Sequence, residues 1–304
     1  LHEKSLLRSS RNIIFALYLY SNISKLNTMG ILIKIIIFIL SLNIFPCLSA
    51  QKKYIILSPS GKDTDKMSII DSCYIRAWYA FNADTINVPN SYEDLQRLEI
   101  GKNFIKYYSY FTFSSDSLCT IWKKKHPQAK ARPRRLGSGG KYPDHWSEYK
   151  HSEIFIDCTQ KQLTEYARMQ FYMQKQNSQA TESVPVQEWT IHDDAMLLIG
   201  QRCQKATCYF RGRKYEAWFT MDIPISKGPW KFGGLPGLIL KITDDKYLDS
   251  FECIRIEQFT SPIYIKRYED YKYYRIMKRE KLLKYQKFIH EYYGKATYYP
   301  LELE

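Results

Sequence analysis

The sequence predicts a mainly β protein, built as one antiparallel curved sheet or half-open barrel with a long C-terminal helix. Two observations predict the sheet. Short runs of alternating apolar and polar residues follow one another, and residues that favour turns separate these runs. Strands that succeed one another without intervening helices are typical of an antiparallel meander. A third observation predicts the helix, because the apolar period lengthens to three or four residues near the C-terminus.

The first 50 residues are interpreted as two segments that precede the folded domain. Residues 1–28 begin with Leu1 and are interpreted as an extension upstream of the true start codon, because Met29 stands directly before an export signal. From Met29, a short N-terminal region and the apolar run Ile31–Phe45 lead to the small-residue site Leu48-Ser49-Ala50. This pattern predicts a secretory signal peptide over residues 29–50.

A membrane anchor is the alternative for this apolar run. The run has about 15 residues and contains Lys34, whereas roughly 20 apolar residues are needed to span a bilayer. We therefore expect cleavage after Ala50, export to the periplasm or outer membrane, and no transmembrane span afterwards. The remaining residues 51–304 are enough for a single domain with its own core.

The chain is basic, with 45 Lys and Arg against 31 Asp and Glu and a formal net charge of +14. In an exported protein, this charge favours anionic lipid or acidic glycan over nucleic acid, for which the sequence shows no binding motif. The strongest charge block is Lys123–Lys141, which carries eight positive residues, no acid and two prolines. It is predicted to be a flexible loop, either an anion-binding arm or a solvated insertion.

Six cysteines follow the predicted cleavage site, and export permits disulfides between them. Buried free thiols are the alternative. A bond between Cys203 and Cys208 is unfavourable if both lie on one regular strand, because they would be about 16 Å apart. Cys253 is then a candidate partner for either one.

The domain is expected to contain strands at several places, while Tyr92–Ile100 and Gln162–Gln176 fit either a helix or a strand. A turn is expected over Ile191–Asp194, leading into Ala195–Gly200. The predicted strands are Asp71–Phe81, Asn103–Phe113, Glu153–Ile156, Cys203–Phe210, Tyr215–Thr220, Leu238–Ile242 and Ser250–Phe259.

The C-terminal helix is expected from about Lys266 to Tyr293, where Gly294 is a good helix stop. Its basic faces would suit an anionic membrane surface, but an aromatic stripe more often covers a sheet. The stripe consists of Tyr271, Tyr274, Leu282, Tyr285, Ile289 and Tyr292.

The stretch Cys203–Asp245 is the densest in Gly, Pro and Trp. Gly212 is expected in a tight turn, and Gly228-Pro229 is expected in the irregular segment that follows the second strand. Leu235-Pro236-Gly237-Leu238 suits a type II turn, in which Gly237 supplies the positive φ. These residues are predicted to be structural.

Gly234-Leu235-Pro236-Gly237-Leu238-Ile239 resembles the defining motif of the GLPGLI family, and the residues around it are similar to that family's core. The resemblance implies an exported protein of Bacteroidota, encoded near TonB-dependent outer-membrane receptors, and it implies no particular reaction. A receptor component is therefore an expected partner. The half-open shape rests on analogy with periplasmic lipid- and lipoprotein-carrier folds.

The ligand-facing residues are expected to be Trp218, Trp230 and Phe232, which lie near the Gly-Pro turns and could line an apolar groove. Packing in the core is the alternative, because each of these aromatics buries about 150–250 Å². The lead hypothesis is a non-enzymatic binding protein of the cell envelope.

The alternative is a hydrolase or metal-dependent enzyme with a dispersed site. No catalytic, metal or cofactor motif is found, since the sequence has no tight His/Cys pair and no Gly-x-Ser-x-Gly. Weak candidates remain at Asp144-His145 with His151, at His192 with Cys203, and at Asp193-Asp194 and Asp244-Asp245.

Overall fold

The computed structural model describes residues 59–293 and residue 302. The chain divides into the units Leu1–Tyr54 and Ile55–Glu304, and the described residues belong to the second. The predicted extension, the signal peptide and the first residues of the predicted domain lie outside the described residues. In the described part of the chain, no helix combines the length and the apolar character needed to cross a membrane.

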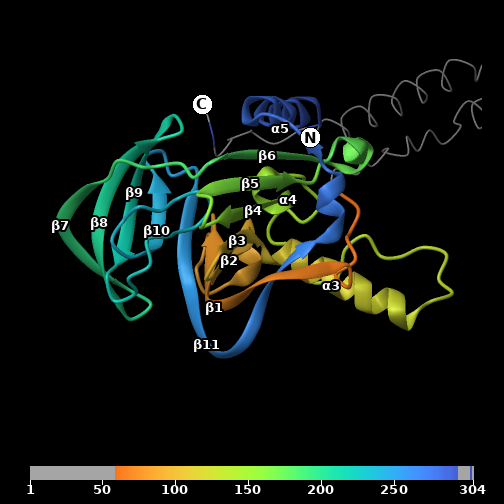
Figure 1. The fold of residues 1–304 in the computed structure, drawn as a ribbon, viewed down its shortest axis with the longest axis horizontal. Coiled ribbons are helices and arrows are strands. Elements are labelled where there is room, and N and C mark those ends of the chain that lie inside the picture. Colours follow the sequence, from red (N-terminus) through yellow and green to blue (C-terminus); the bar gives the residue numbers. More distant parts are fainter. Residues whose placement is uncertain (1–58, 294–301, 303–304) are drawn as a thin grey trace, which may run out of the picture. The chain divides into compact units, whose positions relative to one another are not determined.

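The predicted fold class is confirmed: the described residues form one open 12-stranded sheet that does not close into a barrel. Neighbouring strands are antiparallel, apart from the short β12, which runs parallel to β6. The order across the sheet is β12-β6-β5-β4-β3-β2-β1-β11-β10-β9-β8-β7 (Figure 1). The strands are β1 (Met67–Phe81), β2 (Asp94–Gly101), β3 (Phe104–Ser109), β4 (Ser152–Asp157), β5 (Gln162–Ala167), β6 (Ser178–Ser183), β7 (Thr190–Leu198), β8 (Gln201–Phe210), β9 (Arg213–Thr220), β10 (Leu238–Asp244), β11 (Ser250–Tyr268) and β12 (Arg275–Ile276).

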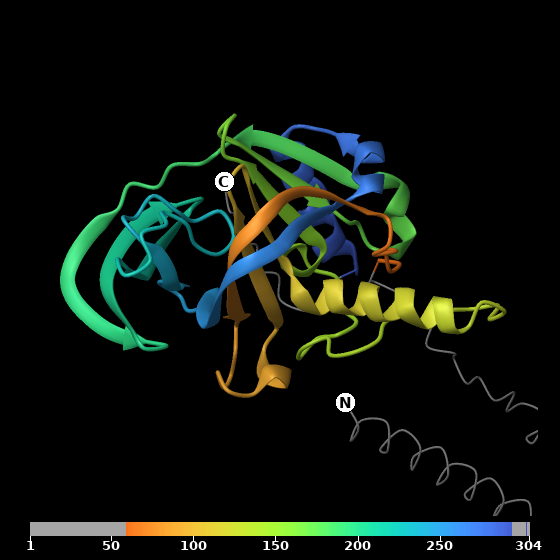
Figure 2. The same cartoon turned by 60° about the horizontal axis from the view of Figure 1, so that its bottom comes forward.

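The long strands β1 and β11 pair along most of their length and form the middle of the sheet. Figure 2 shows them side by side, β1 in orange and β11 in blue. On one side of this pair lie β2 to β6, and on the other lie β10 to β7. The strand β2 resolves the open choice for Tyr92–Ile100, and β7 replaces the turn expected at Ile191–Asp194 with a strand whose register shifts there.

The helix α3 (Tyr110–Lys125) corrects the strand expected over Asn103–Phe113. The strand ends at Ser109, whose hydroxyl accepts the backbone N–H of Thr112 at 3.0 Å and so caps the helix. Since α3 ends at Lys125, the predicted basic loop 123–141 begins in the last helical turn. The other helical segments are α4 (Glu148–His151), η2 (Pro89–Ser91), η3 (Phe171–Gln176) and η4 (Glu269–Tyr273).

The C-terminal helix α5 (Arg279–Tyr293) begins later than expected, because β11 continues to Tyr268. Tyr271 and Tyr274 therefore lie in and just after η4, where they pack in a tyrosine-rich cluster. The remaining stripe of α5 covers part of the sheet: Leu282 and Ile289 are buried in one cluster with Trp146 and Met169.

The main core lies within the curve of the sheet, where the segment between β9 and β10 contributes residues to it. In this segment, Trp230, Phe232 and Leu235 are buried among side chains of β1–β5 and β8–β11. The hydroxyl of Tyr79, on β1, donates to the carbonyl oxygen of Ile239 at 2.8 Å. The Gly-Pro-rich segment is thus a packed part of the core.

The turn glycines behave differently from one another. The turn at Arg211-Gly212 is confirmed, with positive φ at both residues (51° and 81°) as a two-residue hairpin loop of the primed type requires. The positive φ expected at Gly237 is wrong: it occurs at Gly234, where φ is 88°. Gly237 is needed for another reason, because a Cβ there would lie 1.9 Å from the carbonyl oxygen of Thr220.

Candidate functional site

A cleft of about 560 Å³ lies where four segments of the chain meet. The segments are the stretch before β1, the end of α3 with the residues after it, the region around η3, and the end of β11 with η4. We call this the cationic cleft, because six of its lining side chains are basic and three are acidic. The basic ones are Lys62, Lys66, Lys123, Arg132, Arg168 and Lys272, and the acidic ones are Asp63, Glu269 and Asp270.

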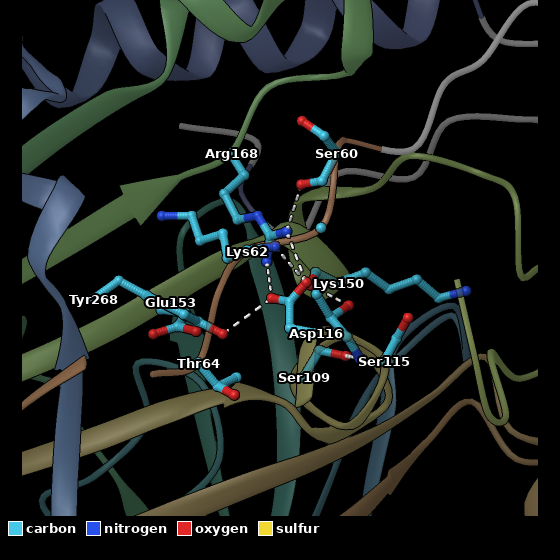
Figure 3. A network of polar contacts seen from close by, with 12 residues as sticks. Ser60, Lys62, Thr64, Ser109, Ser115, Asp116, Lys150, Glu153, Arg168 and Tyr268 are labelled. Carbon is cyan, nitrogen blue, oxygen red and sulfur yellow. Dashed lines mark hydrogen bonds and ion pairs between the residues drawn. The ribbon is translucent and has the colours of Figure 1, made fainter. Parts of the chain in front are cut away.

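A buried ion pair lies beside the cleft, between Asp116 of α3 and Arg168, which follows β5 (Figure 3). Two guanidinium nitrogens of Arg168 donate to the carboxylate at 2.8 and 3.3 Å. The hydroxyl of Tyr268 donates to the same carboxylate at 3.0 Å, and the backbone N–H of Lys62 does so at 2.8 Å. Burial alone would lower the pKa of Arg168, but the charge of Asp116 raises it above its usual range.

The same ion pair and two further hydrogen bonds fasten the segment before β1. Arg168 also donates to the carbonyl oxygen of Ser60 at 3.0 Å, and Thr64 N donates to the hydroxyl of Thr120 at 3.1 Å. Arg132, from the basic loop, donates to the carbonyl oxygen of Gly61 at 2.7 Å. One wall of the cleft is therefore held by contacts to α3, to the basic loop and to the residue after β5.

Lys62 has an unusual environment at this wall. Its ammonium lies 2.7 Å from a carboxylate oxygen of Asp270. It also lies 4.7, 4.0 and 4.7 Å from the ring centroids of Tyr268, Tyr271 and Tyr274. Burial and the nearby charge of Arg168 lower the pKa of Lys62 to about 8, although Asp270 opposes the shift.

The three remaining lysines of the cleft are exposed and available to bind an anion. In the described structure, Lys66, Lys123 and Lys272 form no ion pair, and all three are exposed. Lys272 lies 5.0 Å from the ring centroid of Tyr273, which also lines the cleft. Apart from Pro59, no aliphatic residue of the described chain lines it. The site suits a polar anion better than an acyl chain.

The residues expected to face a ligand lie elsewhere. Trp230 and Phe232 are buried and pack edge to face, with ring centroids 5.2 Å apart. The cavity beside them has a volume of about 10 Å³, too small for a ligand. Trp218 is partly buried against the core, and its indole N–H donates to Glu216 at 3.0 Å. This arrangement matches the alternative in which these aromatics pack the core.

Polar contacts hold the loop that leads into the motif Gly234–Ile239. The indole N–H of Trp189 donates to the carbonyl oxygen of Gly233 at 2.8 Å. Lys231 is buried and pairs with Glu302 and, at 3.0 Å, with Glu165. The charges of Glu165 and Glu302 raise the pKa of Lys231 despite its burial.

A second hollow of about 520 Å³ lies on the sheet between the β7–β8 turn, β11 and the residues after β9. It is lined by Ile199, Ile223, Ile254 and Ile256, together with Gln201, Asp222, Arg255 and Gln258. None of the three expected aromatics lines it.

The weak catalytic candidates are not brought together. Cys203 lies opposite Met196 in the β7–β8 register, and the ring of His192 contacts the hydroxyl of Thr207 at 2.9 Å. His151 is buried, which, with the charge of Arg168, lowers its pKa well below the usual value. The described residues contain no group of three or more His, Cys, Asp or Glu side chains that could hold a metal ion.

The two pairs of consecutive aspartates differ in their surroundings. Asp244 is buried and pairs with Arg213 at 3.0 Å, while its carboxylate accepts two backbone N–H groups of the following turn. Asp193 and Asp194 are exposed on β7. Asp144 pairs with Arg135 at 3.7 Å on the surface.

The six described cysteines are free thiols. The candidate bond from Cys253 to Cys203 or Cys208 is not formed, and all three thiols are buried in the main core. Burial raises the pKa of Cys73 and Cys203 to about 11, and that of Cys208 and Cys253 to about 12.

Comparison with known proteins gives a partial match. Residues 154–241 match the model of a family described as "Protein of unknown function (Porph_ging)", named for Porphyromonas gingivalis of the Bacteroidota. The match runs from β4 to β10, so it takes strands from both sides of the central β1–β11 pair. No curated protein matches the chain.

Two solved structures of PNGF-II, in space groups P21 and C2, are similar at a distance. The first has a TM-score of 0.41 and 14% identity, covering 71% of this chain and 33% of that one. The second has a TM-score of 0.42 and 13% identity, covering 71% and 32%. The chain spans about a third of the length of the PNGF-II chains.

Proposed function

We propose that this is an exported cell-envelope protein of the GLPGLI type that binds an anionic ligand in the cationic cleft. It would act without catalysis, as an accessory of outer-membrane transport in the periplasm or at the outer membrane. The observation that carries the binding proposal is the excess of six basic over three acidic side chains around a cavity of about 560 Å³.

The size and chemistry of the cleft support a small or chain-end anion. Ligand cavities have volumes of about 300–1,000 Å³, and a few placed polar groups usually set their specificity. Lys123 and Arg132 of the basic segment 123–141 line the cleft, which supports a role for that segment in anion binding. The polar lining favours the phosphate or carboxylate of a glycan or lipid headgroup over the lipid's acyl chain.

Export and family membership rest on the sequence. The segment Gly234–Ile239 carries the GLPGLI motif, and the family match at residues 154–241 points to the Bacteroidota. Residues 29–50 have the pattern of a signal peptide. Recovery of a chain that starts at Gln51 in the envelope fraction is the expected result, and a cytoplasmic chain that retains residue 29 would contradict export.

The test of anion binding uses isothermal titration calorimetry with inorganic pyrophosphate as the probe. Lys123→Glu with Lys272→Glu should weaken binding about tenfold or more, which corresponds to about 1.4 kcal/mol. The matched control is Lys125→Glu with Lys246→Glu, because both lysines are exposed and neither lines the cleft. Equal weakening by the two pairs, or no binding to the parent protein, would contradict the proposal.

A further inference from the structure

The cationic cleft contains a lysine whose surroundings differ from those of its other cations. The side chain of Lys62 is only 9% exposed, yet the residue lines the cleft. Its ammonium lies against three tyrosine rings and one carboxylate, whereas Lys66, Lys123 and Lys272 are exposed at the cleft. An amine held inside an anion-binding cavity can bond covalently to a ligand that carries both an anion and a carbonyl group.

We infer that Lys62 captures anionic aldehydes or keto acids in the cleft as a reversible imine. This inference rests on the proposed anion-binding function and specifies the class of ligand.

The rings of Tyr268, Tyr271 and Tyr274 attract the ammonium through cation–π contacts and favour its charged form. Burial and the positive charge of Arg168 outweigh this attraction and favour the neutral, nucleophilic amine. Asp270 and, more weakly, Glu153 oppose this effect. Burial near another cation is one way in which proteins activate lysine as a nucleophile.

The carboxylate of Asp270, 2.7 Å from the amine, provides the proton acceptor that imine formation requires. Asp270 first takes one proton from the ammonium. The amine nitrogen then attacks the carbonyl carbon and, after proton transfer, gives a neutral carbinolamine. Asp270 returns its proton to the carbinolamine hydroxyl, which leaves as water while the nitrogen lone pair forms the C=N bond. No oxidant or reductant takes part, and hydrolysis reverses the reaction.

The anionic part of the ligand is needed for selectivity. Lys66, Lys123 and Lys272 can hold a phosphate or carboxylate, since they form no ion pair with any residue that the structure describes. An uncharged carbonyl compound lacks this attraction and should meet Lys62 no more often than it meets any exposed lysine.

The experiment compares pyridoxal 5′-phosphate with pyridoxal, two aldehydes that differ by the phosphate. The protein is incubated with either aldehyde, the imine is reduced with sodium cyanoborohydride, and the modified lysines are mapped by peptide mass spectrometry. The phosphate ester should label Lys62 at least about tenfold faster than pyridoxal does, and faster than it labels the exposed Lys125. Lys62→Arg should abolish the adduct at this peptide, whereas Lys125→Arg should leave it unchanged.

The two proposals can fail separately. Pyrophosphate binding without an adduct on Lys62 would overturn the imine and leave the anion site intact. Labelling spread evenly over exposed lysines, or equal labelling of Lys62 by pyridoxal, would also overturn it. Absence of pyrophosphate binding would instead remove the proposed function.

Discussion

The carboxylate of Asp116 and the guanidinium of Arg168 form a two-point contact in the interior, with N–O distances of 2.8 and 3.3 Å. Their side chains are 3% and 4% exposed. The contact joins α3 to the residue after β5, and both partners also hold the segment that begins at Ser60. Because the hydroxyl of Tyr268 donates to the same carboxylate, this ion pair contacts all four segments that surround the cationic cleft.

Breaking this pair should destabilise the protein strongly. Asp116→Ala should cost about 3–5 kcal/mol of unfolding free energy, because it leaves Arg168 buried and charged without its partner. Urea denaturation measures the loss. Adding Arg168→Met to Asp116→Ala should cost less than the sum of the single changes, since the two residues are coupled.

The matched control is the exposed pair of Lys124 and Asp65, 2.7 Å apart on the surface. Asp65→Ala should change the unfolding free energy by no more than about 1 kcal/mol. A similar loss for both aspartates would show that burial does not set the strength of the Asp116 contact.

The lowered pKa of Lys62 predicts a pH dependence of stability. The pKa is about 8 in the folded protein against the ordinary lysine value of 10.5, so between these pH values the unfolded chain binds a proton that the folded chain does not. The contribution of Lys62 to the unfolding free energy therefore rises with pH, by at most about 1.4 kcal/mol per pH unit.

Urea denaturation at several pH values between about 8 and 9.5 isolates this contribution when the parent protein is compared with Lys62→Met. The difference in unfolding free energy should shift in favour of the parent protein as the pH rises. Lys66→Met, which removes an exposed cation of the same cleft, should give a difference that stays constant. A constant difference for Lys62→Met would contradict the lowered pKa.

Gly234 and Gly237 lie in one turn but are required for different reasons, the first for its positive φ and the second because a Cβ has no space there. Gly237→Ala should cost about 3 kcal/mol or more, because its Cβ would collide with the backbone of Thr220. Gly234→Ala should cost about 1–2 kcal/mol, since φ is 88° there but the nearest atom, of Trp189, is 3.6 Å away. Thermal and urea denaturation of both variants give the order, and a reversed order would contradict the close approach.

The cysteines should differ in their reactivity. Cys158 is partly exposed, whereas the other five described thiols are buried. Iodoacetamide should therefore alkylate Cys158 first in the native protein, and Cys203, Cys208 and Cys253 should react only in denaturant, since their raised pKa values leave little thiolate near pH 8. Peptide mass spectrometry measures the order. Thiols that stay unreactive in denaturant until a reductant is added would reveal a disulfide.

The elements found from the sequence are those that neighbouring residues determine. Gly212 predicts the hairpin turn because glycine favours tight turns, alternating residues on either side predict β8 and β9, and the apolar run Leu238–Ile242 predicts β10. α3 was missed because the aromatic run from Tyr107 to Phe113 favours a strand. The deciding interaction is the cap at Ser109, which ends the strand and starts the helix.

The candidate site could be predicted only in small part. The basic segment was visible in the sequence, and its residues Lys123 and Arg132 do line the cleft. The contacts of Asp116 with Lys62, Arg168 and Tyr268 span 54, 52 and 152 residues along the chain. No local pattern marks these residues, because only the long-range strand order brings them together. Of the aromatics near the Gly-Pro turns, Trp230 and Phe232 are buried in the core.

The pairing of β1 with β11 has a consequence for the order in which the protein can be made and folded. A ribosome completes Met67–Phe81 long before it reaches Ser250–Tyr268. Until then, one edge of β1 lacks its partner strand β11. The strands β1 to β6 can pair one after another as they emerge, but the two sides of the sheet are joined only when β11 arrives. A chain still emerging from the ribosome therefore lacks the strand pairing that joins the two sides of its sheet.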